Sequence, residues 1–185
     1  SILRGFSAPV VLDIDHTDDQ LLHLLAHDSD PFNRWEAGQR LTLRRALHAV
    51  QATGPVHAPL DAAVLDALRH VLRHPMLDAA FKELVLTLPG EDYIAEQLDV
   101  VDPQRIHAVC DAMERQLAAD LRDDWQWACE QNEHTGAYTP DPVSAGRRAL
   151  AGLALHMLCL AARDSGDAVW PGKAYQRVKD AGNMT

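Results

Sequence analysis

The chain has 185 residues, of which 47% are hydrophobic and 24% are charged, a balance typical of a globular protein with a buried core. The same composition excludes intrinsically disordered and fibrous classes. Its 17 basic and 27 acidic residues give a net charge of −10, which repels phosphate groups, so we expect no nucleic-acid partner.

The first residues differ in character from the rest of the chain. Residues 2–14 are strand-like, contain Pro9 and have no hairpin partner nearby, and an isolated strand leaves its backbone groups unsatisfied. At the other end, Asn183 begins a polar stretch typical of a helix start, with no helix after it. We therefore expect a piece of a longer protein, with residues 1–16 as a strand remnant and linker.

Helix signals follow one another from Thr17 onward, separated by short breaks. Most predicted helices open on Thr or Asp, which cap the first backbone N–H groups, and Pro follows directly in Asp30-Pro31 and Asp102-Pro103. Apolar residues then recur three or four positions apart until Gly or Pro ends the pattern. The first five predicted helices cover residues 17–28, 30–53, 61–74, 78–88 and 91–98.

The second half of the chain contains the longest helical patterns. An apolar stripe from Ile106 through Leu121 to Trp125 predicts one continuous helix from residue 102 to about residue 131. A polar loop over 130–141, an apolar and therefore central helix over 142–163, and a weaker helix over 168–179 should follow.

These elements predict an all-α fold, an irregular α-solenoid or bundle of antiparallel helices, beside the short N-terminal strand remnant. The chain contains 28 Ala and 25 Leu against 17 Val and Ile together, which also favours helices over strands. No fixed repeat period is visible, so we do not expect a regular repeat class.

Two histidine pairs have the spacing of metal ligands: His23 with His27, and His70 with His74. Residues four apart share one face of a helix, which is why zinc peptidases use His-Glu-x-x-His. Here a leucine and a valine stand where that motif has its glutamate, so neither pair has a general base for a metal-bound water. Neither pair has an identifiable third ligand. We interpret both as surface histidines and expect no stoichiometric zinc in this chain.

The other polar clusters are interpreted as structural. His107 and Cys110 share a helix face, yet Cys110 lies on the apolar stripe and fits a buried thiol better than a ligand. Acidic pairs occur where acidic residues are routine, and the arginines of one helix are balanced by nearby acids. Glu133-His134 in the predicted loop has no converging partner. The acidic pairs are Asp13/Asp15, Asp18/Asp19 and Asp123/Asp124, and the arginines are Arg34, Arg40, Arg44 and Arg45.

We therefore predict no catalytic, cofactor-binding or metal-binding residue in this chain, which also lacks a nucleophile elbow, a Gly-rich phosphate loop and Cys-x-x-Cys. Cys110, Cys129 and Cys159 are widely spaced within helical patterns, as expected of reduced thiols in a cytoplasmic protein. The longest apolar run, residues 149–162, is interrupted by His156 and is too short to span a bilayer, so we expect no membrane partner.

Four ordered stretches resemble one protein family, the bacterial aminopeptidase N family of M1 zinc metallopeptidases. Residues 3–10 (LRGFSAPV) resemble the end of that family's β-sandwich domain, and residues 27–37 (HDSDPFNRWEA) resemble the start of its C-terminal helical domain. Residues 88–103 (LPGEDYIAEQLDVVDP) and 183–185 (NMT) match in the same order. The resemblance covers essentially the whole chain.

The resemblance implies that residues 1–16 are a remnant of the β-sandwich domain and that residues 17–185 are the first part of the C-terminal helical domain. The family's zinc motif (His-Glu-x-x-His with a downstream Glu) and its Gly-x-Met-x-Asn motif do not occur here, so no catalytic residue carries over. The implied role is a non-catalytic helical wall that restricts access to a zinc site on upstream domains of an enzyme releasing N-terminal residues from peptides. The implied partners are those domains and the peptide substrates.

The alternative is a stand-alone helical scaffold that binds protein partners in a groove. A reading frame that extends upstream with His-Glu-x-x-His favours the peptidase, whereas a start codon just before Ser1 favours the scaffold.

Overall fold

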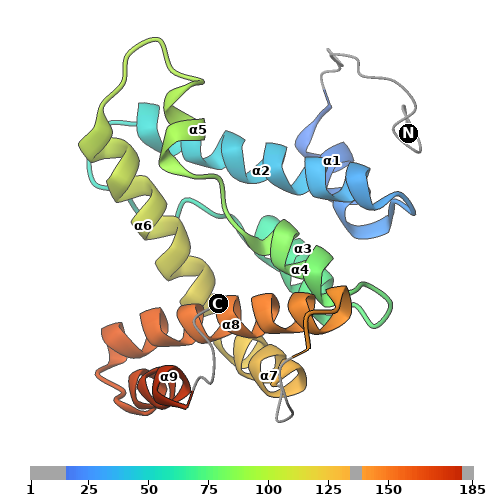
Figure 1. Cartoon of the computed structure of the whole chain (residues 1–185). Helices are drawn as coiled ribbons and strands as arrows, with labels where there is room; N and C mark the ends of the chain where they lie inside the picture. Colours follow the sequence, from blue (N-terminus) through green and yellow to red (C-terminus); the bar gives the residue numbers. More distant parts are fainter. Residues whose placement is uncertain (1–15, 134–138, 181–185) are drawn as a thin grey trace.

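The computed structural model describes residues 16–133 and 139–180, and within these ranges every regular element is an α-helix, which confirms the predicted all-α class. The strand expected in residues 2–14 lies outside the described residues. The helices of the described ranges (Figure 1) are α1 Asp18–His27, α2 Pro31–Gln51, α3 Ala62–Arg73, α4 Ala79–Leu86, α5 Glu91–Ala95, α6 Pro103–Asp120, α7 Arg122–Asn132, α8 Pro142–Ser165 and α9 Val169–Lys179.

Polar side chains start most of these helices. Asp30, Asp102 and Asp141 each precede a proline at the first helical position, and each carboxylate accepts a hydrogen bond from a backbone N–H of the first turn. Thr17 starts α1 through a capping box with Gln20. Because such caps are a local property of the sequence, the predicted helix starts agree with the structure to within one residue, apart from the start of α7.

The continuous helix predicted over residues 102–131 is wrong, since the structure has two helices, α6 and α7. The break falls at Leu121, whose ψ of 22° departs from the helical value of about −42°. The Trp125 indole N–H folds back and donates to the carbonyl oxygen of Leu117 at 3.1 Å, and the backbone N–H of Leu121 donates to the same oxygen. Neither Gly nor Pro marks the junction, so the apolar spacing runs through it unchanged.

Two long helices, α2 and α8, belong to different layers that α4 and α6 connect. Helix α2 contacts α1, α3, α4, α5 and α6, whereas α8 contacts α4, α6, α7 and α9. Figure 1 shows α1 and α2 across the upper part of the molecule, with α6 descending to the level of α7, α8 and α9. Helix α8 therefore has the central place in its layer that its apolar sequence predicts.

The hydrophobic core is continuous through both layers. Leu41 of α2, Leu117 of α6 and Leu158 of α8 are fully buried members of one cluster. Helices α4 and α8 approach closely at Gly146, where a Cβ atom would lie 2.8 Å from the Cβ of Ala80. No helix of the described ranges combines the length and the apolar character needed to cross a bilayer.

Two arginines satisfy backbone carbonyl groups at the ends of other helices. Arg34 of α2 is 5% exposed, and its guanidinium donates to the carbonyl oxygens of Leu25 and Ala26 near the end of α1, at 2.9 and 3.1 Å. Arg105 of α6 reaches the end of α2 in the same way. Its acceptors are the carbonyl oxygens of Ala49, Ala52 and Gly54, at 2.7, 2.9 and 2.5 Å.

Candidate functional site

The fold brings the two predicted histidine pairs together. His23 and His27 belong to α1, His70 belongs to α3 and His74 ends it, and α1 contacts α3. Successive ring centroids lie 5.0 Å (His23–His27), 6.2 Å (His27–His70) and 5.7 Å (His70–His74) apart. We call these four imidazoles the histidine row. The i, i+4 spacing indicates each pair, whereas their meeting depends on how α1 packs against α3.

At one end of the row, His74 accepts a hydrogen bond and lies near positively charged side chains. The Nδ1 atom of His74 accepts a hydrogen bond from the backbone N–H of Met76 at 3.2 Å, so Nε2 carries the proton in the neutral ring. Burial lowers the pKa of His74, and the nearby charges of Arg34, His70 and Lys82 lower it further.

The other three rings of the row are open to solvent. His23, His27 and His70 are exposed and make no hydrogen bond or ion pair with the part of the chain that the structure describes. Their ring nitrogens are therefore available to a ligand from solution.

The histidine row does not fit the catalytic zinc centre of a peptidase. Leu24 and Val71 occupy the positions at which His-Glu-x-x-His has its general base. Across residues 16–133 and 139–180, no three His, Cys, Asp or Glu side chains are arranged to hold a metal ion. We therefore assign no step of peptide hydrolysis to these residues.

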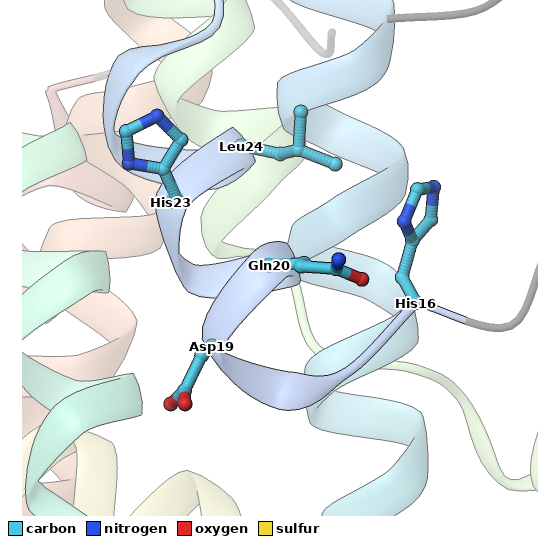
Figure 2. Close-up of a pocket in the computed structure, with 5 residues that line it drawn as sticks. All are labelled: His16, Asp19, Gln20, His23 and Leu24. Carbon is cyan, nitrogen blue, oxygen red and sulfur yellow. The ribbon is translucent and has the colours of Figure 1, made fainter.

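A hollow of about 350 Å³ lies on α1 beside the histidine row. Its lining comes from α1 and the residue before Thr17: His16, Asp19, Gln20, His23 and Leu24. Figure 2 shows Asp19 and His23 on one side of the helix and His16 on the other. The hollow is open, with a lining from one short segment, and its side chains do not converge on a common point, so it does not have the form of an active site.

His107 and Cys110 do not make a joint site. The Nδ1 atom of His107 lies 2.7 Å from the carboxylate of Glu91, and this hydrogen bond raises the pKa of His107. Burial raises the pKa of Cys110 to about 11, so its thiol is protonated at neutral pH and is a poor nucleophile. Cys129 and Cys159 are also half-buried free thiols whose pKa is raised by burial.

One carboxylate of each described acidic pair, Asp18 and Asp124, ties helices together. Asp18 accepts hydrogen bonds from Arg45 at 2.6 Å and Arg44 at 2.9 Å, and these bonds lower the pKa of Asp18. Asp124 of α7 binds two arginines of α3, and Arg40 binds Glu36 within α2. Asp19, Asp123 and Glu133 are exposed, whereas Asp13, Asp15 and His134 lie outside the described residues.

One cationic cluster has no signal in the sequence. Lys82 of α4 is 8% exposed, and its Nζ atom lies 5.7 Å from the centre of the Trp127 ring, which the Arg73 guanidinium also covers at 4.4 Å. Burial lowers the pKa of Lys82. A lysine in a short helix suggests a solvent-facing position, and its burial arises because α4 contacts α2, α3 and α8.

A match to a known family gives the class of this helical protein. Residues 18–185 match the family described as "Domain of unknown function (DUF3458_C) ARM repeats", and the chain belongs to this family. An irregular α-solenoid is the predicted architecture, but a repeat description was not expected from a sequence without a fixed period.

The proteins most informative about this chain are bacterial aminopeptidases. Aminopeptidase N of Caulobacter vibrioides is 38% identical over 150 residues, covering 81% of this chain and 17% of the relative. Aminopeptidase N of Escherichia coli is 32% identical over 190 residues, covering 100% of this chain and 21% of the relative. These matches confirm the resemblance to the aminopeptidase N family, and they show that the chain spans about a fifth of the length of these relatives.

A solved structure shares the fold. The crystal structure of Legionella pneumophila aminopeptidase A in complex with aspartic acid matches with a TM-score of 0.79 and 21% identity. The match covers 99% of this chain and 22% of that chain. The helical arrangement described above is therefore also a part of a larger aminopeptidase.

Proposed function

We propose that this chain is a non-catalytic helical portion of a zinc aminopeptidase that releases N-terminal residues from peptides. The observation that carries the proposal is that all of this chain aligns with only 21% of Escherichia coli aminopeptidase N. Because the chain lacks the zinc motif and its general base, both would be supplied by other domains of the same polypeptide.

The role of the helices would be to restrict access to that active site. Interhelical ion pairs support a stiff wall: the Arg45 side chain, for example, binds Asp18 of α1 at 2.6 Å and Asp61 before α3 at 2.5 Å. A stiff wall over a deep site admits unfolded peptides and excludes folded proteins. The net charge of −10 would also attract the cationic N-terminus of a peptide.

The state of the cysteines favours the cytoplasm as the location. Cys110, Cys129 and Cys159 are free thiols, and unpaired cysteines are typical of proteins in a reducing compartment.

The first test compares this chain with the full polypeptide that its gene encodes. Leucyl and alanyl anilides should be hydrolysed by the full polypeptide and not by the 185-residue chain, with or without added zinc. The reading frame should contain His-Glu-x-x-His upstream of this segment. A frame without that motif, or turnover by the chain alone, would contradict the proposal and favour the helical scaffold.

The second test concerns access. The full polypeptide should cleave a short peptide much faster than a folded protein with the same N-terminal residue. A variant lacking the helical segment, if it remains folded by circular dichroism, should lose much of this discrimination. Equal discrimination in both proteins would show that the helices do not control access.

A further inference from the structure

We propose that Lys82, beside Arg73 and the Trp127 ring, is a binding site for a carboxylate group, carried either by a small organic acid or by the C-terminal end of a peptide. Lys82 belongs to α4, Arg73 to α3 and Trp127 to α7, and α3 contacts both other helices. The inference does not depend on the proposed function. It rests on a nearly buried lysine that has no counter-ion among the described residues.

The Lys82 side chain is buried without a polar partner. It is 8% exposed, yet its ammonium group makes no hydrogen bond or ion pair with the part of the chain that the structure describes. Asp78, one helical turn earlier, uses one carboxylate oxygen to cap α4 by accepting the backbone N–H of Phe81. Burial lowers the pKa of Lys82, and the charge of Asp78 opposes this shift only in part. Because a buried ammonium group is costly unless it is paired, a bound anion would be stabilised here.

The ammonium group of Lys82 can be reached from solution although most of the side chain is covered. Within the described residues, the fully buried side-chain nitrogen or oxygen atom that lacks a partner is Nε of Arg105. Nζ of Lys82 also lacks a partner, so it must reach the surface rather than end inside the core. The aliphatic stem therefore accounts for the burial, and the charged tip is the part that a ligand can contact.

The neighbours of Lys82 add further hydrogen-bond donors. Nζ of Lys82 lies 5.7 Å from the centre of the Trp127 ring, and Cζ of Arg73 lies 4.4 Å from the same centre. Arg73 donates through Nε to Asp124 at 2.7 Å, which leaves its two terminal nitrogens without an acceptor in the described residues. The Trp127 indole N–H has no acceptor there either. Positive charge together with unpaired donors suits an oxyanion.

The local charges favour a carboxylate over a phosphate group. Arg73 already has Asp124 as its counter-ion, so the uncompensated charge is the single one of Lys82. A carboxylate supplies one negative charge, whereas a phosphate monoester carries about −1.5 to −2 at neutral pH and would be repelled by Asp78 and Asp124. The half-buried Trp127 ring also offers an apolar surface to the carbon atoms attached to a carboxylate.

The experiment follows the tryptophan indole N–H signals of the 185-residue chain by proton–nitrogen correlation NMR at constant ionic strength. The titrants are sodium acetate, N-acetyl-dialanine and the C-terminal amide of that dipeptide. The Trp127 signal, assigned with Trp127→Phe, should shift saturably with at least one of the two carboxylates and not with the amide. Tighter binding of the dipeptide assigns a peptide end as the ligand, and equal or tighter binding of acetate assigns a small organic acid. Lys82→Met, which keeps the apolar stem, should bind at least about tenfold more weakly.

Lys173→Met is the matched control. Lys173 also lies over a tryptophan, 4.2 Å from the centre of the Trp170 ring, but it is exposed, so this variant should bind like the parent chain. Circular dichroism checks that each variant is folded, and Lys82→Gln gives the same test should Lys82→Met fail to fold. The proposal would be overturned by no saturable shift with either carboxylate, by equal binding of the amide, by unchanged affinity in the Lys82 variant, or by an equal loss in Lys173→Met.

Discussion

At the scale of single residues, Arg34 and Arg105 each complete the hydrogen bonding of a helix to which they do not belong. The last carbonyl groups of a helix have no partner within it, and such groups are costly when they are buried. Arg34 is itself buried, so its two hydrogen bonds to the end of α1 also satisfy the guanidinium.

Replacing Arg34 by Met should therefore lower the free energy of unfolding by about 1–3 kcal/mol, because two carbonyl oxygens lose their donor while the aliphatic packing is kept. Urea unfolding at neutral pH measures the change. The control is Arg163→Met at an exposed position of α8, where we expect a change of about 0.5 kcal/mol or less. Equal effects of the two variants would mean that the Arg34 hydrogen bonds contribute nothing specific.

Two histidines should change stability with pH in opposite directions. The folded-state pKa of His74 is lowered, chiefly by burial, so below the unfolded value of about 6.5 the unfolded chain binds the additional proton and stability falls. The folded-state pKa of His107 is raised by the Glu91 carboxylate, so its contribution is present in acid and is lost as the pH rises through that pKa.

Urea unfolding at pH 7.5 and pH 5.5 tests these signs. His74→Asn, which keeps an acceptor for the Met76 N–H, should reduce the loss of stability on acidification, whereas His107→Asn should increase that loss. If both variants changed the loss of stability on acidification in the same direction, the described environments of His74 and His107 would be contradicted.

The residue types of the candidate site could be predicted from the sequence, but their arrangement could not. The i, i+4 spacing identifies His23/His27 and His70/His74 because it is a property of one helix. The packing of α1 against α3 sets the 6.2 Å distance between the ring centroids of His27 and His70. The local sequence holds no signal for that packing. The burial of Lys82 is unpredictable for the same reason.

At the scale of whole elements, α6 and α7 are two helices where the apolar spacing predicts one. The turn at Leu121 lets α7 pack against α8 while α6 continues to contact α2, α5 and α8. Helix starts were predictable because Asp and Thr caps are local signals. The junction was not, because neither Gly nor Pro marks it and the apolar spacing continues through Leu121 unchanged.

Leu117→Ala should lower the free energy of unfolding by about 2–5 kcal/mol, because the side chain is fully buried and its removal leaves a cavity. Chemical denaturation measures this loss. Leu84→Ala is the matched control, since Leu84 is 49% exposed on α4, and it should cost about 0.5 kcal/mol or less. A cost for Leu117→Ala as small as that of the control would contradict the described core.

At the scale of the whole molecule, the contacts of α4 and α6 with both long helices predict a single cooperative unfolding unit. Thermal unfolding followed by far-UV circular dichroism and by tryptophan fluorescence should have the same midpoint. Trp35 reports on α2, whereas Trp125, Trp127 and Trp170 report on α7 and α9. Different midpoints for the two signals would instead show that parts of the fold melt separately.

The hydrogen bonds of Arg105 also have a consequence for synthesis on the ribosome. Arg105 follows Ala52, one of its acceptors, by 53 residues, and at about 5–20 residues per second these take roughly 3–10 s to translate. During that interval the carbonyl groups at the end of α2 lack the Arg105 guanidinium as their donor, and α6 does not yet cover the apolar surface of α2. A chain that stalls before residue 105 therefore presents an unfinished helix end and an uncovered core surface together, a state that a chaperone or a protease would recognise.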